Sequence, residues 1–250
     1  MQNEHTGDQI DVLICDRDNH VIRMISILNI RTKPTVTNMQ LLAGKVRVAG
    51  FSNGTFENAR FNEPFGVAVM KNSQIVFVSD HMNDCIRILN LKEKKVFTIS
   101  SLHSNQAGAN FVFKGPIGIA IHKHQERMYV SEFRNHTISE LDISALHSDP
   151  LSTALDIKRT YGVQSKGGFN DGVGDNASFC SPQGMTFSTT NADILFVCET
   201  GNRTIRNKLI FSPSAHHMSN KKEKKIHSCT HKAKPFDLKI KCILKIKYGN

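Results

Sequence analysis

The chain carries short apolar runs of strand length, separated by polar turns, and no stretch between them has helical periodicity. The runs at 75–79 (IVFVS) and 128–131 (MYVS) each lead into an acid, and an asparagine follows three residues after that acid. Shorter β-branched runs, VAV at 67–69 and IAI at 119–121, follow a Pro-x-Gly break. Apolar runs of about four to eight residues bounded by turn-forming residues are typical of β-strands. The pattern predicts an all-β protein.

Four segments of the chain repeat one pattern of residues, at 11–25, 75–89, 127–141 and 194–208. In each segment an acid ends an apolar run, asparagine follows three residues later, and isoleucine comes three residues after that. Arginine is next in three copies, and Ser139 takes its place in the other. The repeated acids, asparagines and arginines are Asp16, Asn19, Arg23, Asp80, Asn83, Arg87, Glu132, Asn135, Glu199, Asn202 and Arg206. Agreement at several fixed offsets indicates internal repeats.

We interpret these repeated polar residues as structural. The acid can accept hydrogen bonds from turn amides, asparagine tolerates the left-handed backbone of a tight turn, and arginine can pair with the acid. The alternative is a ring of acids that contact a metal or a ligand. Recurrence in every copy favours the structural interpretation, because a binding site normally takes different residues from different repeats.

Two further elements precede the repeated segments. A Pro-x-Gly element opens PFGVAV (64–69), PIGIAI (116–121) and PQGMTF (182–187). Ahead of it, segments 50–66 and 168–184 align without a gap and share Gly-Phe, then Asn-Gly or Asp-Gly, then Asn-Ala, Phe and Pro. Each repeat is therefore predicted to hold three or four antiparallel strands, which is the content of a β-propeller blade.

This combination of motifs resembles the NHL-repeat family over about residues 10–210. The resemblance implies blades arranged around a central channel, usually as a closed ring of six. Here it implies an incomplete β-propeller arc of about three and a half to four blades, with an irregular tail. Because neighbouring repeats must bury one another's apolar faces, we expect further blades N-terminal to this sequence, C-terminal to it, or both.

The charge of the chain is concentrated near its C-terminus. From Lys208 onward there are eleven lysines and two acids, whereas the whole chain has a net charge of +10, so the preceding residues are close to neutral. We divide the chain into an N-terminal lead (1–9), NHL-type blades (10–210) and a basic tail (211–250). The tail is predicted to be disordered or non-native. The alternative is a basic arm that binds nucleic acid or anionic lipid.

The sequence shows neither a targeting segment nor a membrane-spanning segment. The N-terminus lacks the apolar segment of a secretory leader, and no run is long enough to span a membrane. The six cysteines include no CxxC pair. These features predict a reduced chain in the cytoplasm. Four glycosylation sequons, at Asn53, Asn135, Asn176 and Asn202, all fall inside the repeats, where asparagine has a structural use.

Candidate chemical sites are few. His122 and His124 could bind a metal only if their loop turned both side chains inward. The Asn-Gly and Asp-Gly pairs at Gly54 and Gly172 lack the strand–loop–helix context of a phosphate-binding loop, and the acidic segment 171–175 lacks the length and terminal glutamate of a calcium loop. We therefore expect no catalytic residue, metal ligand or cofactor, and we identify no small-molecule substrate.

The function predicted from these features is that of a non-catalytic scaffold whose propeller loops bind a protein partner. Propellers host many unrelated functions, so fold alone does not settle this assignment. One alternative is an RNA-binding propeller, which the near-neutral repeat region disfavours. Another is a metal-dependent lyase or hydrolase whose channel site is incomplete in this sequence.

Overall fold

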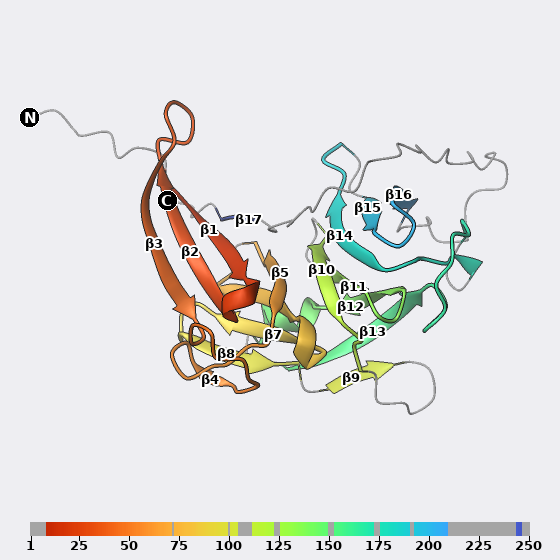
Figure 1. Ribbon diagram of the computed structural model, residues 1–250, viewed down its shortest axis with the longest axis horizontal. Coiled ribbons are helices and arrows are strands. Elements are labelled where there is room, and N and C mark those ends of the chain that lie inside the picture. The colour runs from red at the N-terminus through yellow and green to blue at the C-terminus, as the bar shows by residue number, and fades with distance from the viewer. Residues whose placement is uncertain are drawn as a thin grey trace, which may run out of the picture.

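In a computed structural model, the described part of the protein forms four sheets, which are antiparallel except for one parallel pair of strands (Figure 1). The structure describes residues 9–71, 73–99, 101–104, 112–122, 126–149, 153–172, 176–190, 193–209 and 244–246. Within these residues the only helices are single turns of 3-10 helix, η1 (Arg17–Asn19), η2 (His81–Asn83) and η3 (Ser144–His147). No helix in the described ranges is long and apolar enough to cross a membrane.

Each of the four repeats forms one sheet, which we call blades 1 to 4. Blade 1 holds β1 (Gln9–Asp16), β2 (Val21–Leu28), β3 (Thr35–Ala43) and β17 (Leu244–Ile246). Blade 2 holds β4 (Gly54–Thr55), β5 (Pro64–Val69), β6 (Ile75–Asp80), β7 (Cys85–Asn90) and β8 (Lys95–Thr98). Blade 3 holds β9 (Ser101–Ser104), β10 (Pro116–Ile121), β11 (Arg127–Glu132), β12 (Thr137–Asp142) and β13 (Ala154–Tyr161). Blade 4 holds β14 (Pro182–Phe187), β15 (Ile194–Glu199) and β16 (Thr204–Leu209).

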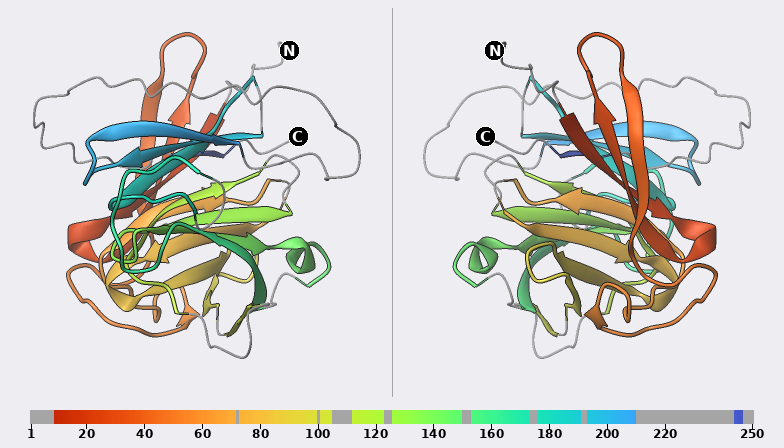
Figure 2. Two further views of the ribbon diagram at one scale, coloured as in Figure 1. Left: turned by 90° about the vertical axis from the view of Figure 1, so that its right-hand side faces the viewer. Right: turned by 90° about the vertical axis from the view of Figure 1, so that its left-hand side faces the viewer.

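The Pro-x-Gly strands β5, β10 and β14 lie side by side on the inner side of an open arc, and successive strands of each blade step outward (Figure 1). The hairpin of β2 and β3 projects beyond the other sheets (Figure 2). The expected all-β arc of about four blades is confirmed, and none of the sheets closes on itself.

A separate apolar core fills each of the three gaps between blades. Because side chains alternate across a strand, blades 2 and 3 each have one face toward the preceding blade and one toward the following blade. Leu13 and Ile22 of blade 1 pack on Val76 and Leu89 of blade 2. Blade 2 packs on blade 3 through a core that includes Phe77 and Met128, and blade 3 packs on blade 4 through one that includes Tyr129 and Leu195. The repeated apolar pattern thus produces stacking of neighbours, as expected for repeat architectures.

Two strands have no counterpart in the sequence-based prediction. β9 leaves blade 2 and pairs in parallel with β13 at the outer edge of blade 3. β17, at 244–246, pairs antiparallel with β1 and lies within the segment predicted to be an irregular tail. The other residues of 210–250 and residues 1–8 lie outside the described part of the chain.

Candidate functional site

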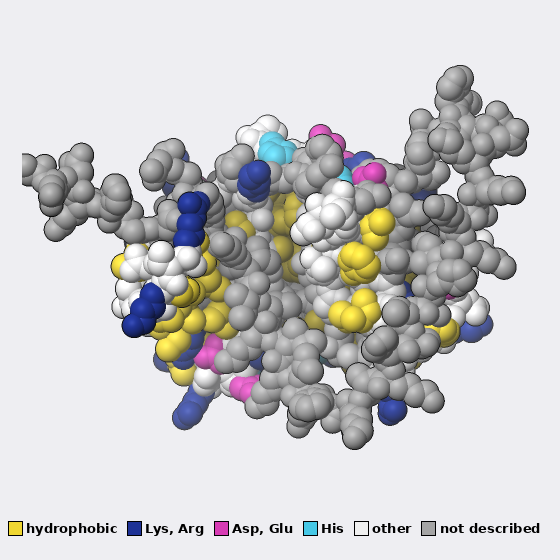
Figure 3. Space-filling view, turned by 90° about the horizontal axis from the view of Figure 1, so that it is seen from above, with side chains coloured by type: hydrophobic (Ala, Val, Ile, Leu, Met, Phe, Trp, Pro, Cys, Tyr) yellow, Lys and Arg dark blue, Asp and Glu magenta, His cyan; other side chains and the backbone are white. Residues whose placement is uncertain are grey.

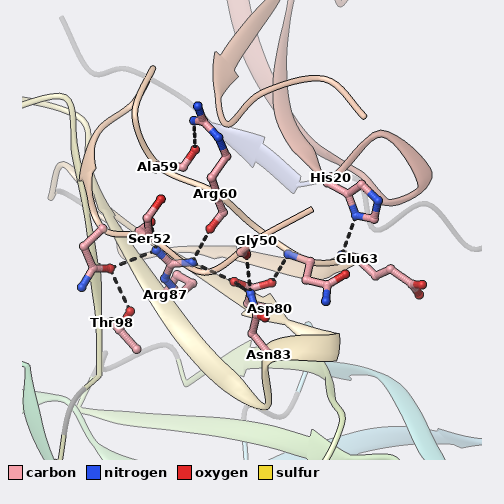
Figure 4. Close-up of polar contacts among 12 residues, drawn as sticks. His20, Gly50, Ser52, Ala59, Arg60, Glu63, Asp80, Asn83, Arg87 and Thr98 are labelled. Atoms are coloured by element: carbon pink, nitrogen blue, oxygen red, sulfur yellow. Dashed lines mark hydrogen bonds and ion pairs between the residues drawn. The ribbon is translucent and has the colours of Figure 1, made fainter. Parts of the chain in front are cut away.

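The repeated acid, asparagine and arginine form one compact hydrogen-bonded group in blade 2 (Figure 4). Asp80 ends β6, and one of its carboxylate oxygens accepts hydrogen bonds from Arg87 at 2.8 Å and Asn83 at 2.9 Å. The other oxygen accepts from the backbone N–H of Asn62 at 2.7 Å. The Asp80 and Arg87 side chains are both fully buried. Burial raises the pKa of Asp80, and the bonds from Asn62, Asn83 and Arg87 act against that increase.

The guanidinium of Arg87 is held by the Gly-Phe segment, residues 50–66, which opens the same blade. It donates to the carbonyl oxygens of Arg60 at 2.8 Å and Ser52 at 2.6 Å, and to the Asn53 side chain at 2.9 Å. The rings of Phe51 and Phe61 lie 5.2 and 5.0 Å from the guanidinium carbon. The repeated Gly-Phe, Asn and Phe positions therefore enclose this arginine. We call the acid, the arginine and the enclosing segment the arginine network.

Blade 4 contains the same network with different residues. Arg206 donates to Glu199 at 3.0 Å, to the Ser178 carbonyl at 2.7 Å and to the Asn170 carbonyl at 2.8 Å. Its guanidinium lies 5.4 Å from the Phe169 ring and 5.1 Å from the Phe179 ring. Asn202 donates to Glu199 at 2.7 Å, as Asn83 does to Asp80. Arg206 also donates a hydrogen bond to Asp171, which belongs to the acidic segment considered above as a calcium loop.

Blades 1 and 3 carry reduced forms of the network. In blade 1, Arg23 pairs with Asp16 at 2.7 Å, both side chains are 26% exposed, and Asn19 donates to Asp16 at 3.0 Å. In blade 3 the arginine is replaced by Ser139, which donates to Glu132 at 2.5 Å. Asn135 and the backbone N–H of Lys114 also donate to Glu132, at 3.3 and 3.1 Å.

Glu132 is the one acid of the four with no arginine beside it, and burial raises its pKa above the usual value. The carboxyl group of Glu132 therefore binds a proton more tightly in the folded protein than in the unfolded chain. Above the folded-state pKa, the buried charge of ionised Glu132 lowers the free energy of unfolding. This loss of stability is relieved as pH falls through the folded-state pKa.

We predict that Glu132→Gln stabilises the protein at pH 7 by on the order of 1 kcal/mol, because the amide keeps the acceptor and removes the buried charge. The advantage over wild type should shrink between pH 7 and pH 5 in urea unfolding followed by circular dichroism. An advantage that stays constant with pH would contradict the prediction. Glu126→Gln, at an exposed acid just before the opposite end of β11, serves as the control.

A second set of polar contacts joins each blade to the next, and the repeat pattern did not identify it. The left-handed backbone that was expected at the repeated asparagine lies instead at the residue after it in all four copies, with φ between 54° and 60°. In three copies its side chain accepts a hydrogen bond from a backbone N–H at the start of the next inner strand. These pairs are His20 with Glu63 (3.1 Å), Asp84 with Gly115 (2.6 Å) and His136 with Ser181 (3.0 Å). The fourth copy has Arg203, which has no acceptor atom.

The inner strands of neighbouring blades are also bridged by the side chain of the serine that precedes the repeated acid. Ser79 accepts from Gly66 N–H at 2.6 Å and donates to the Ile117 carbonyl of the next blade at 2.7 Å. Ser131 makes the same two bonds to Gly118 N–H and the Gln183 carbonyl, at 2.8 and 2.6 Å. The available signal was the small residue at this position in every repeat, which is serine in blades 2 and 3 and cysteine in blades 1 and 4.

The inner strands line a hollow of about 250 Å³ with apolar side chains and backbone. Its lining includes Val69, Ile121 and Phe187. His122, considered above as a metal ligand, is buried beside it with its ring 5.2 Å from that of Phe187, and His124 lies outside the described residues. Where the chain is described, no three His, Cys, Asp or Glu side chains are grouped so that they could hold a metal ion.

Three strongly exposed apolar side chains lie together on one face of blade 1. Val36, Met39 and Leu41 of β3 are 61%, 61% and 45% exposed, and Phe51 in the following segment is 60% exposed. Figure 3 shows hydrophobic side chains gathered over the end of the molecule that holds β1 to β3. We call Val36, Met39 and Leu41 the blade 1 surface. Exposed apolar groups of this kind mark candidate interaction surfaces.

Comparisons with known proteins agree with the repeat geometry. NHL repeat-containing protein 2 of Gallus gallus is 28% identical over 142 residues, which cover 53% of this chain and 19% of that protein. The Bos taurus protein of the same name is 27% identical over 141 residues, with the same coverage of both chains. The described blades are similar to NHL-type propeller repeats. It spans about a fifth of the length of the curated relatives that it matches.

Among solved structures the likeness concerns the fold alone. A protein from Bacteroides thetaiotaomicron aligns with 77% of this chain and 40% of its own, at 13% identity and a TM-score of 0.50. A chain of the nidogen/laminin complex aligns with 79% of this chain and 56% of its own, at 12% identity and a TM-score of 0.48. No protein-family model matches the sequence.

Proposed function

We propose that these NHL-type blades form a non-catalytic scaffold that binds another protein through the blade 1 surface. The observation that carries this proposal is the exposure of Val36, Met39 and Leu41 on a sheet face, at 45% to 61% each. Water contact with large apolar side chains is unfavourable, and burying them against a partner is worth roughly 25 cal/mol per Å² before the costs of association.

The polar chemistry of the repeats supports a structural role for the groups that could otherwise act on a substrate. Asp80 and Arg87 are fully buried, and their hydrogen bonds go to each other and to neighbouring backbone and side chains. Glu199 is likewise buried and bonded to Arg206 and Asn202. Buried side chains bonded in this way hold the neighbouring loops in place and are not positioned to contact a ligand at the surface.

The test is site-specific photocrosslinking of the full chain in lysate of its own cells. A photoreactive residue at position 39 is expected to give discrete protein adducts. The same residue at Gln40, the next residue along β3, should give few, because neighbouring side chains point to opposite faces. Leu41→Glu should reduce the adducts from position 39.

Adducts to RNA alone, or equal labelling from positions 39 and 40, would contradict a protein-binding role for this surface. The masses of the adducts distinguish a second copy of this chain from a different protein.

A further inference from the structure

The turn contact between each blade and the next depends on one side chain that accepts a hydrogen bond. His20, Asp84 and His136 hold equivalent positions, and each accepts from a backbone N–H of the following blade at 2.6 to 3.1 Å. A backbone N–H can only donate, so the Nδ1 atom of each histidine carries no proton and the neutral ring has its proton on Nε2. The contacts made by the two histidines therefore exist in one protonation state alone.

The middle junction makes the same contact with a group of different acid–base chemistry. One carboxylate oxygen of Asp84 accepts from Gly115 N–H at 2.6 Å and also binds Arg134. Carboxyl groups ordinarily gain a proton at about pH 4, whereas histidine is the side chain that ordinarily gains its charge between about pH 5 and pH 8. The junction between blades 2 and 3 should therefore keep its bond over a pH range in which the other two lose theirs.

A proton on Nδ1 turns the attraction at these contacts into a repulsion. The lone pair that receives the backbone N–H is lost, and the charged ring places its own N–H against that of Glu63 or Ser181. A backbone N–H without a partner is costly to keep away from water. Both residues lie immediately before an inner strand, β5 or β14. The movement that relieves the repulsion therefore separates the turn of one blade from the inner strand of the next.

A third histidine lies at the middle junction and responds differently to a proton. The Nδ1 atom of His81 lies 3.3 Å from the carbonyl oxygen of Pro116. That oxygen can only accept, so the His81 ring donates and keeps this bond when it is charged. Burial lowers the pKa of His81, and the bond to Pro116 acts against that decrease. The junctions thus differ in whether the histidine accepts or donates.

Other ionisable groups lie on the elements packed against the two acceptor histidines. Around His20 these are Asp16, Arg17, Asp18, Lys45, Arg47 and Glu63. Around His136 they are Glu132, Arg134, Lys166, Cys180 and Glu199. Glu63, Glu132 and Glu199 already accept hydrogen bonds from Arg17, Ser139 and Arg206. A charged ring at either position would have to compete for these acids.

We infer that His20 and His136 are pH-sensitive contacts that break between about pH 7 and pH 5.5 and loosen blades 1 and 4 against blades 2 and 3, which stay joined through Asp84. The apolar cores at both junctions remain, so the change is a local opening of the turns and not unfolding. The inference concerns the coupling between blades and does not depend on the proposed binding role.

Amide hydrogen exchange of the full chain, followed residue by residue by NMR at about pH 7.5 and pH 5.5, tests the inference without any substitution. After correction for the intrinsic effect of pH on exchange, protection of the Glu63 and Ser181 amides should fall about ten-fold, the loss expected for one hydrogen bond. Protection of the Gly115 amide should not change. An equal loss at Gly115, or no loss at Glu63 and Ser181, would overturn the inference.

Exchanging the acceptors between junctions should exchange their pH dependence. His136→Asp should make protection of the Ser181 amide independent of pH in this range, and Asp84→His should make that of Gly115 fall. Positions 84 and 136 have φ of 54° and 60°, a conformation that Asp and His tolerate better than most residues. His147→Asp, at an exposed histidine in η3, is the control and should change none of the three amides.

A Ser181 amide that still loses protection at low pH in His136→Asp would overturn the inference, because the histidine would then not be its cause. The wild-type comparison and His136→Asp are each decisive alone, so the test does not depend on the folding of Asp84→His.

Discussion

Gly66→Ala and Gly118→Ala should each destabilise the protein by about 3 kcal/mol, at the upper end of the range for overpacking. A Cβ atom at Gly66 would lie 2.0 Å from the Ile117 carbonyl oxygen, and one at Gly118 would lie 2.1 Å from that of Gln183. Both neighbours are backbone atoms of the next inner strand, so a rotamer change cannot relieve the clash. The inner strands would have to separate, and the serine bonds between blades would lengthen.

Gly184 provides the matched control, because it occupies the same Pro-x-Gly position in blade 4 and has no atom within 4 Å of its would-be Cβ. Gly184→Ala should change stability by no more than about 0.5 kcal/mol. Urea unfolding followed by circular dichroism measures all three variants. Equal losses of stability for Gly66→Ala and Gly184→Ala would show that replacing glycine within the strand causes the loss, and not the close approach of the next blade.

Arg87→Ala should cost about 3–5 kcal/mol, because it leaves the buried Asp80 carboxylate without its cation. Burial already raises the pKa of Asp80, and loss of Arg87 should raise it further. A folded-state pKa above the unfolded value means that the charge penalty is present at high pH and is relieved as pH falls through the folded pKa. The variant should therefore recover part of its stability between pH 7 and pH 5.

Arg23→Ala is the control for this effect, since it removes the equivalent arginine from a partly exposed pair. Exposed pairs are worth about 0–1 kcal/mol, so the loss should be small and nearly independent of pH above 5. Equal losses at Arg23 and Arg87 would mean that pairing with the acid, and not enclosure by the Gly-Phe segment, determines the strength of the arginine network.

The sequence predicted the blades and the pairing of the repeated arginine with the acid, because both depend on residues at fixed offsets. The acid, asparagine and arginine lie within eight consecutive residues, and the turn between them forces them together. The segment that encloses the arginine was recognised as a repeat, but its role was hidden because Arg60 and Ser52 act through backbone carbonyls. Any residue supplies a carbonyl, and so residue identity carries no signal for such contacts.

The contacts between blades were harder to predict for a different physical reason. His20, Asp84 and His136 share only the ability to accept a hydrogen bond, so an alignment by residue type treats their position as variable. Exposure of Met39 and Ile205 could not be foreseen either, since both match their buried equivalents in character. Exposure depends on the presence of a neighbouring blade, which the local pattern does not encode.

The parallel pairing of β9 with β13 has a consequence for how the chain folds. Residues 101–104 close a ladder with residues 154–157, and the whole of β10, β11 and β12 lies in the loop between them. Such pairing orders a long loop before its contacts are gained, which slows folding. Blade 3 cannot complete its outer edge until the connection from blade 2 is in place. The two middle blades should therefore gain protection from amide exchange together, as one cooperative unit.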